Sequence, residues 1–408
     1  MRIAIDARFI NPENRGLSTY TRNLIFGLEK IDRKNLYYIL LRQKDCATLG
    51  QTRGQAQTLF RNPNFKIIPA EAHWYGIKEQ FLIPKILYKL KPDLTHFPHF
   101  NVPLIYNRPY ITTIHDLILF AYPTKKATTL GPLQYAIKNW AYRLTINHAL
   151  KKSRAIIAVS QGTAQDILRF FTNMDKDRII TIYEGAGEEK QESEIKKYKS
   201  IPSKKRQEWL QKKLSLKFPY IFYIGGAYPH KNLERLIFAF NSARKKYYDA
   251  TNKNLHLVIA GGEDYFFNRL KNLTRENRIK NVILPGFISD PKTFEFIYQE
   301  ALFCIFPSLY EGFGLPPLEA LKREKLTLCH NGTCFPEILG DSVAYFDGKS
   351  VTDMSDKITD ALENLPSLKK EYLPRAKQIL RKYSWTKMAR ETLELYEKVA
   401  GGKTLNNG

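Results

Sequence analysis

Short apolar runs alternate with longer amphipathic stretches along nearly the whole chain. The runs are rich in β-branched and aromatic residues, as strands are, whereas the stretches between them have the apolar spacing of helices. This alternation predicts parallel sheets covered by helices. Strands are predicted at Arg2–Ala7 and in "YYILL", "FKIIPA", "DLTHF", "YITTIHD", "AIIAVS", "RIITIYEG", "YIFYIGG", "NLHLVIAGG", "NVILPGF" and "ALFCIFPS".

The same opening plan of strand, glycine-containing loop and helix occurs twice. After the first strand a helix is predicted from about Ser18 to Lys30, and after "YIFYIGG" another in "HKNLERLIFAFNSARKK". Residues 188–215 are charged and lack strand signals, which predicts a linker. Since 408 residues exceed one ordinary core, we predict two doubly wound domains at 1–187 and 216–383, and a final helix at 384–400.

The chain is strongly basic. Lys and Arg number 64 against 40 Asp and Glu, which gives a formal charge of +24. Such a surface attracts phosphates, whether they belong to nucleic acid, anionic lipid or a nucleotide. Charge alone does not choose among these partners.

The four cysteines are too few and too scattered for a disulfide framework. Cys329, His330 and Cys334 resemble metal ligands, but no second cluster completes a zinc set, so packing is the preferred interpretation. The start of the chain lacks the apolar stretch of a signal peptide, and no apolar segment of about 18 residues follows. The expected location is cytoplasmic.

Two glutamates bracket the irregular segment after the apolar run "ALFCIF". Glu311 is predicted in the loop at the carboxyl end of the strand, where open α/β sheets bind ligands, and Glu319 in the first turn of the next helix. Carboxylates accept hydrogen bonds from the paired hydroxyls of sugars, and Gly312 and Gly314 let the backbone approach a ligand. The alternative for Glu319 is favourable interaction with the helix dipole.

The loop after "YIFYI" has the parts of an anion site. Gly225 and Gly226 are followed by a predicted helix start, and Lys231 adds a full positive charge. His230 could donate a further hydrogen bond. Considered alone, Lys231 would be a solvated surface cation; the glycines and the helix start favour phosphate binding.

The first half offers one histidine in a comparable place. His115 follows the β-branched run of "YITTIHDL", at the carboxyl end of a predicted strand. A structural role and a functional role are equally open for it on this evidence. Gly16, in the loop predicted after the first strand, would let a phosphate or sugar approach.

Taken together, these motifs resemble the family-four retaining glycosyltransferases of the GT-B fold. The strongest match is the E-x7-E pattern from Glu311 to Glu319 within "PSLYEGFGLPPLEAL". "TIHDL", "AVSQGTAQDI", "YIGGAYPHKNLERL" and "PGFISD" occur in the expected order, so the likeness covers nearly the whole chain. It implies two Rossmann-like domains facing across a cleft, with the final helix crossing back to the first domain.

The resemblance also implies roles for individual residues. Glu311 would contact hydroxyls of the transferred sugar, Glu319 would hold the nucleotide ribose, and Lys231 would contact the diphosphate. Backbone amides around Gly312, Phe313, Gly314 and Leu315 would assist, and the segment from Gly286 to Ile288 would border the base. From the first, acceptor-side domain, His115 would approach the donor sugar and Gly16 would face the diphosphate.

One departure from the family concerns the phosphate site. Many relatives carry an arginine in the region where this chain has Gly226 and His230. A neutral histidine supplies less charge than a guanidinium, so stabilisation of the diphosphate would depend more heavily on Lys231.

The expected activity is transfer of a hexose, mannose first and glucose next, from a nucleotide-diphosphate sugar to a glycan or lipid-linked glycan, with retained configuration. No cofactor beyond the donor is expected. The one Asp-x-Asp sequence, Asp175 to Asp177, is interpreted as a solvated loop, and metal-independent catalysis is predicted.

Two other classes compete with a transferase. A retaining glycosidase also needs two carboxylates, but that class fits poorly with a lysine beside a phosphate-type loop. A basic nucleic-acid-binding protein would explain the charge, yet no such module appears, and no nucleic-acid partner is expected.

The positive charge also suits docking to anionic lipid at the inner membrane face. The candidate segment for this docking is "WYGIKEQFLIPKILYKLKP", which begins with Trp74. Its alternative is a helix packed on the first sheet.

Overall fold

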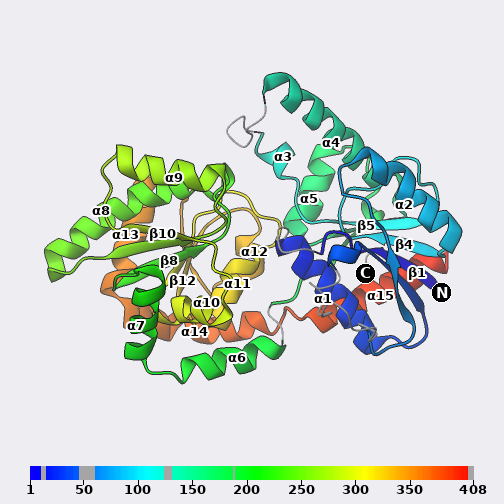
Figure 1. Ribbon diagram of the computed structural model, residues 1–408. Helices are drawn as coiled ribbons and strands as arrows, with labels where there is room; N and C mark the ends of the chain where they lie inside the picture. The colour runs from blue at the N-terminus through cyan, green and yellow to red at the C-terminus, as the bar shows by residue number, and fades with distance from the viewer. Residues whose placement is uncertain (11–14, 46–59, 124–130, 187–188, 403–408) are drawn as a thin grey trace. The chain divides into compact units, whose positions relative to one another are not determined.

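The computed structural model describes residues 1–10, 15–45, 60–123, 131–186 and 189–402. Its contacts divide the chain into two compact units. Unit 1 contains Met1–Leu117, Leu130–Gly185 and Tyr383–Gly408, and unit 2 contains Ile118–Thr129 and Ala186–Lys382. Each unit is built on one parallel sheet (Figure 1). The two predicted α/β sheets are therefore confirmed.

Unit 1 has a seven-stranded parallel sheet in the order β3-β2-β1-β4-β5-β6-β7. Helices cover such sheets on both faces, which is why β4, β5 and β6 are buried along their whole length. The strand order reverses between β1 and β4, so a ligand crevice is expected at their carboxyl ends. The strands are β1 (Arg2–Asp6), β2 (Leu36–Leu41), β3 (Phe65–Pro69), β4 (Leu94–Phe97), β5 (Tyr110–Ile114), β6 (Ala155–Ala158) and β7 (Ile179–Thr181).

The helices of unit 1 begin close to the predicted signals. Ser160 caps its helix by accepting a hydrogen bond from the Thr163 amide, as the sequence predicts. The first helix begins at Arg15 rather than Ser18, so Gly16 lies in its first turn and not in the preceding loop. The helices are α1 (Arg15–Ile31), α2 (Ile77–Leu90), α4 (Pro132–Lys152), α5 (Gln161–Phe170) and α15 (Trp385–Ala400), with a short 3₁₀ helix η3 (Lys176–Arg178).

The last helix, α15, packs against α1 in unit 1. A Cβ added at Gly27 of α1 would lie 2.6 Å from Cβ of Ala389, so the two helices approach closely at a glycine. The Tyr396 hydroxyl lies 2.6 Å from Nδ1 of the buried His96 on β4. The carboxyl-terminal helix is therefore part of the core of unit 1.

Unit 2 has a six-stranded parallel sheet in the order β10-β9-β8-β11-β12-β13. Its order reverses between β8 and β11, which again predicts a ligand crevice. Sequence reasoning did not find β12 and β13, which have four and three residues. The strands are β8 (Tyr220–Ile224), β9 (His256–Ala260), β10 (Val282–Gly286), β11 (Cys304–Phe306), β12 (Thr327–His330) and β13 (Ala344–Phe346).

The segment predicted as a linker is helical instead. Its helices α6 and α7 pack on α10, where the Arg206 Nε lies 2.6 Å from the Glu300 carboxylate and Trp209 donates to the Thr293 hydroxyl at 3.0 Å. The segment thus belongs to unit 2. The helices assigned to unit 2 are α3 (Ile118–Ala121), α6 (Glu189–Lys199), α7 (Ser203–Leu214), η4 (Pro229–Lys231), α8 (Leu233–Thr251), α9 (Tyr265–Glu276), α10 (Pro291–Glu300), α11 (Leu315–Lys322), α12 (Phe335–Leu339), α13 (Val351–Glu363) and α14 (Leu365–Leu380).

Trp74, at the start of the segment that the sequence offers as a candidate for membrane docking, is 9% exposed and packs on Phe9 and Arg42. The following helix α2 buries Ile83 and Leu87 against unit 1. Packing therefore explains Trp74 and the inner face of α2. Among the described residues, no helix is both long and apolar enough to span a bilayer.

Candidate functional site

Lys231 and Glu311 meet at the carboxyl ends of β8 and β11. The Lys231 ammonium donates to the Glu311 carboxylate at 2.6 Å, and both side chains are largely shielded, with 19% and 16% exposure. The two residues follow the two strands between which the sheet order reverses. The structure thus brings together two of the predicted site residues where an open sheet is expected to bind a ligand.

Two side chains that the sequence analysis missed fix this pair. The Glu311 amide donates to the Thr333 hydroxyl at 2.9 Å, and that hydroxyl donates to the Glu311 carbonyl at 2.8 Å. Thr333 has φ of 56°, a strained conformation for a β-branched residue. Next to Lys231, the buried Asn232 donates to the carbonyls of Pro307 and Gly348 at 3.1 and 2.7 Å. These contacts join the loops after β8, β11, β12 and β13.

The glycines at this edge are required by the backbone. Gly225 has φ of +149° and follows β8, and Gly314 has φ of +92° and precedes α11. A Cβ at Gly314 would lie 2.7 Å from the Phe335 ring. Both glycines therefore allow a close backbone turn at the predicted ligand edge, as the sequence indicates. Gly226 accepts a hydrogen bond from the Tyr223 hydroxyl at 3.0 Å, which holds the loop.

His230 is electrically neutral in this setting. Its removal from water, reinforced by the Lys231 charge, lowers its pKa to about 3, although the side chain is only half-buried. Its carbonyl accepts a hydrogen bond from the Leu309 amide at 2.8 Å, which connects the loops after β8 and β11. At neutral pH the fixed positive charge of the η4 turn is therefore that of Lys231.

The segment after Glu311 leads directly into α11. Gly312 and Gly314 flank the buried Phe313, and Leu315 is the first residue of the helix. Glu319 is the fifth residue of α11 and half-buried, so it lies beyond the first turn in which the sequence placed it. This later position weakens the alternative in which Glu319 only complements the helix dipole, because that effect is confined to the first turn.

Ile288 follows β10, at the edge of the same sheet. It is half-buried in the loop before α10. The Gly261 amide after β9 donates to the Gly286 carbonyl at 3.0 Å, so the ends of β9 and β10 are tied together. Ile288 thus lies on the carboxyl side of the sheet, two strands away from β8.

In unit 1, His115 follows β5, and each of its ring nitrogens lies within hydrogen-bond distance of an oxygen atom. Its Nδ1 lies 3.1 Å from the carboxylate of Glu184, and its Nε2 lies 3.0 Å from the Pro98 carbonyl. Tyr20 of α1 packs edge-on against the ring, with centroids 4.7 Å apart. Gly16 lies one helical turn before Tyr20, so it belongs to the same corner of unit 1. Glu184 is 4% exposed and was not singled out from the sequence.

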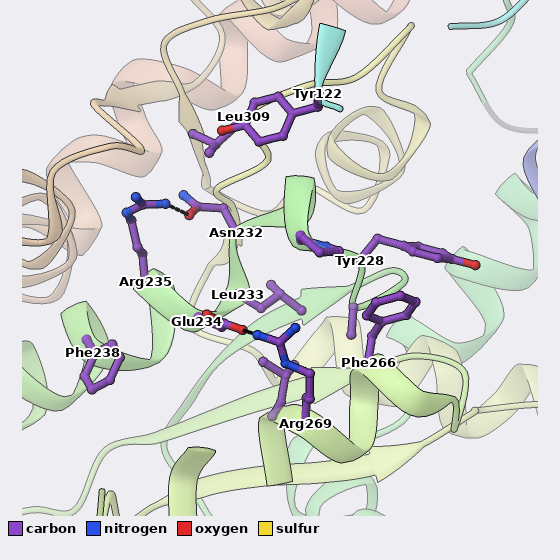
Figure 2. A pocket seen from close by; sticks show the side chains of 13 residues that line it. Tyr122, Tyr228, Asn232, Leu233, Glu234, Arg235, Phe238, Phe266, Arg269 and Leu309 are labelled. Atoms are coloured by element: carbon purple, nitrogen blue, oxygen red, sulfur yellow. Dashed lines mark hydrogen bonds and ion pairs between the residues drawn. The ribbon is translucent and has the colours of Figure 1, made fainter. Parts of the chain in front are cut away.

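A hollow of about 420 Å³ adjoins the Lys231 loop in unit 2. Its charged groups are already paired: Arg269 with Glu234 at 2.5 Å, and Arg235 with the Asn232 side chain at 3.0 Å (Figure 2). Lys231 and Glu311 lie outside its lining, so the hollow is a neighbour of the pair. It is lined by Tyr122, Ala227, Tyr228, Pro229, Asn232, Leu233, Glu234, Arg235, Phe238, Phe266, Arg269, Leu270 and Leu309.

The residues that resembled metal ligands are buried or hydrogen-bonded within the protein. Cys329 and Cys334 are buried and reduced, and the nearby His330 accepts from the Gly348 amide at 2.9 Å. Asp175 caps η3 by accepting from the Asp177 amide. Within the described ranges, no cluster of three or more His, Cys, Asp or Glu could hold a metal ion. Cys46 lies outside the described residues.

Comparison with known families identifies both halves of the chain. Residues 15–189 match the family described as Glycosyltransferase Family 4, and residues 205–378 match Glycosyl transferases group 1. The first match covers the strands of unit 1 from β2 to β7, and the second covers all six strands of the unit 2 sheet.

Curated relatives are similar over parts of their length. The serotype-specific mannosyltransferase WbdA of Escherichia coli is 29% identical over 253 residues, which are 60% of this chain and 29% of WbdA, so the chain spans less than a third of that relative. The O-antigen chain mannosyltransferase B of Escherichia coli is 25% identical over 311 residues, 75% of this chain and 74% of the relative.

Among solved structures, Anabaena HepE in complex with UDP and glucose has a TM-score of 0.69 at 15% identity, over 98% of this chain and all of HepE. Sucrose-phosphate synthase from Thermosynechococcus elongatus has the same TM-score and identity over 99% of this chain. At this identity the likeness concerns the fold alone, and the two parallel-sheet units together make the GT-B fold.

Proposed function

The chain belongs to the group 1, family-four glycosyltransferases, and from this premise we propose that it transfers a mannosyl group from a nucleotide-diphosphate sugar to a glycan acceptor. The main support is the ion pair of Lys231 and Glu311 at the carboxyl ends of β8 and β11, where the strand order of unit 2 reverses. The similarity to O-antigen mannosyltransferases favours mannose over glucose.

The two charges have complementary tasks in the proposed reaction. The bond between the anomeric carbon and the diphosphate breaks, and a bond to the acceptor oxygen forms on the same face of the sugar. The acceptor proton passes to the departing diphosphate. Lys231 stabilises the charge that develops on this leaving group, while Glu311 accepts hydrogen bonds from sugar hydroxyls.

The remaining predicted residues complete the donor site in this proposal. Glu319 binds the ribose, Ile288 borders the base, and the amides from Gly312 to Leu315 face the diphosphate. His115 is proposed to contact the donor sugar, for which one of the two present contacts of its ring nitrogens must be exchanged. Catalysis proceeds without a metal; loss of activity with a chelator and its recovery with a divalent ion would contradict this.

The test is a thermal-shift screen of the full chain against nucleotide-diphosphate sugars, including mannose and glucose donors, followed by detection of transfer by mass spectrometry. We expect the guanosine-diphosphate mannose arm to stabilise the protein. Hydrolysis of a simple glycoside without consumption of any sugar nucleotide would favour a glycosidase instead. Salt-sensitive binding of RNA or DNA alone would favour a nucleic-acid-binding protein.

The acceptor is proposed to be presented at an anionic membrane surface. On the outer face of α2, Ile77 and Phe81 are 82% and 64% exposed, and the exposed Lys78, Lys85 and Lys89 lie beside them. Apolar side chains flanked by lysines suit the interface of a bilayer containing anionic lipid. Co-sedimentation with phosphatidylglycerol vesicles at low salt should fall when both apolar residues are changed to Ser; equal sedimentation would remove this face from membrane binding.

A further inference from the structure

Three aromatic rings gather at the carboxyl edge of the unit 1 sheet. Tyr75 precedes α2, Phe100 follows β4 and Tyr142 comes from α4. The ring centroids of Tyr75 and Phe100 are 6.2 Å apart, and those of Phe100 and Tyr142 are 5.0 Å apart. Phe100 is 9% exposed, whereas Tyr75 is 61% exposed. A buried ring thus supports an exposed one beside the point where the strand order reverses.

The exposed ring of Tyr75 is held by an unusual backbone. Tyr75 has φ of 60°, which for a bulky residue costs about 1–3 kcal/mol and persists only where its surroundings impose it. Its amide donates to the Glu79 carboxylate at 3.2 Å. Glu79 is fully buried, and it also accepts from Arg8 at 3.1 Å and from Asn101 at 2.7 Å.

Buried charges of this kind contribute little net stability, because desolvation offsets their attraction. The network of Arg8, Glu79 and Asn101 instead determines where the backbone of Tyr75 lies. A buried polar network that fixes an exposed aromatic side chain indicates a surface built for contact with a ligand.

Polar groups accompany the rings. His99 is 8% exposed, its ring lies 4.9 Å from Phe9 and 3.9 Å from Phe100, and its buried Nδ1 has no partner among the described residues. Aromatic faces with a few polar groups at their border match a pyranose ring, which has apolar C–H faces and a rim of hydroxyls.

We propose that Tyr75 and Tyr142, supported by Phe100, form a stacking platform for a sugar ring of the acceptor, whose hydroxyls are bound, directly or through water, by His99. The proposal rests on the proposed function, which requires a second sugar besides the donor. The platform adds to that function the residues that bind the acceptor sugar and their mode of recognition, which is stacking of the sugar ring on aromatic side chains.

The experiment measures sugar binding and donor binding separately on the full chain. Methyl α-D-mannopyranoside serves as the acceptor probe, and saturation-transfer NMR with irradiation of aromatic protons reports its binding. Calorimetric titration with guanosine-diphosphate mannose reports donor binding. The variants are Tyr75→Ala, Tyr75→Phe, which keeps the ring, and Tyr248→Ala, which removes a 46% exposed tyrosine of α8 as a control.

We expect Tyr75→Ala to weaken probe binding about tenfold, while Tyr75→Phe and Tyr248→Ala bind it like the unmodified protein. Donor affinity should be the same in all four proteins. No saturation transfer to the probe in the unmodified protein, or equal transfer in Tyr75→Ala, overturns the platform. Failure of the unmodified protein to bind any sugar nucleotide instead overturns the proposed function, whatever the probe does.

Discussion

Lys231 and Glu311 form a partly exposed ion pair, and such pairs add little to folding stability. Their proximity therefore has a different consequence. When a donor binds, the ammonium can turn to the diphosphate and the carboxylate to the sugar hydroxyls, so neither charge is left unpaired in the shielded site. The two charges neutralise each other in the pair, and in the proposed complex they contact two different parts of one ligand.

Replacing Lys231 by Ala should lower kcat/KM about a hundredfold or more, because it removes the charge that stabilises the leaving group in the proposed reaction. Lys253→Ala removes an exposed lysine beyond α8 and should leave the steady-state kinetics unchanged. A Lys231→Ala variant with unmodified kcat/KM would exclude this residue from the mechanism.

Glu184 is proposed as a positioning residue for His115, whose Nδ1 it meets at 3.1 Å. Glu184→Gln should reduce kcat roughly tenfold with little effect on the donor KM, since a misplaced group costs rate more than binding. The control is Glu208→Gln on the exposed side of α7. Loss of thermal stability with intact kcat would reveal a purely structural role.

The buried His96 should make unit 1 sensitive to acid. Burial lowers its pKa from 6.5 to about 3, so the unfolded chain binds the proton more readily than the folded one. Its contribution is complete above about pH 6.5 and declines as pH falls toward 3, by up to ~1.4 kcal/mol per pH unit. Urea unfolding at pH 7.5 and 5.5 should show a smaller pH-dependent loss for His96→Asn than for the unmodified protein; identical losses would contradict this assignment.

At the scale of elements, the contact between α1 and α15 depends on Gly27. An added Cβ would lie 2.6 Å from Cβ of Ala389. Gly27→Ala should therefore destabilise unit 1 by about 1–3 kcal/mol, even though alanine favours helices by ~1 kcal/mol. Gly131→Ala, where a Cβ meets nothing within 4 Å, is the control for chemical denaturation. Equal or greater stability of Gly27→Ala would mean that α15 does not pack so closely.

Strands and helices with clear hydrophobic patterns were predictable, and helices with few buried residues were not. The core strands are continuous apolar runs, and such a run is typical of a parallel strand that helices cover on both faces. In contrast, α7 buries only Leu210 among its described residues, and its many charged positions resemble a linker. The strands β12 and β13 are too short for their pattern to stand out.

The candidate site was predictable where its chemistry follows a strand end, as for Lys231, Glu311 and His115. The supporting residues were not. Thr333 acts on Glu311 from 22 positions away, and Glu184 acts on His115 from 69 positions away. Such contacts depend on which strands become neighbours, and the local pattern of a single sequence does not contain that order.

Across the whole molecule, the two sheets have similar topology but carry different kinds of residue at the point where the strand order of each sheet reverses. Unit 2 has glycine turns, a lysine and carboxylates, which suit a phosphorylated sugar. Unit 1 has aromatic rings around a buried polar network, which suit a sugar without phosphate. We infer that the division into two units corresponds to a division between donor and acceptor.

In the proposed complex, Lys231 and Glu311 hold one donor by its phosphates and its sugar. The most direct measurement is calorimetric titration of the unmodified chain and Glu311→Gln with guanosine-diphosphate mannose and with guanosine diphosphate. We expect Glu311→Gln to weaken binding of the sugar nucleotide about tenfold or more while binding of the diphosphate is preserved. Equal affinity of both proteins for the sugar nucleotide, or no binding by the unmodified chain, would contradict it.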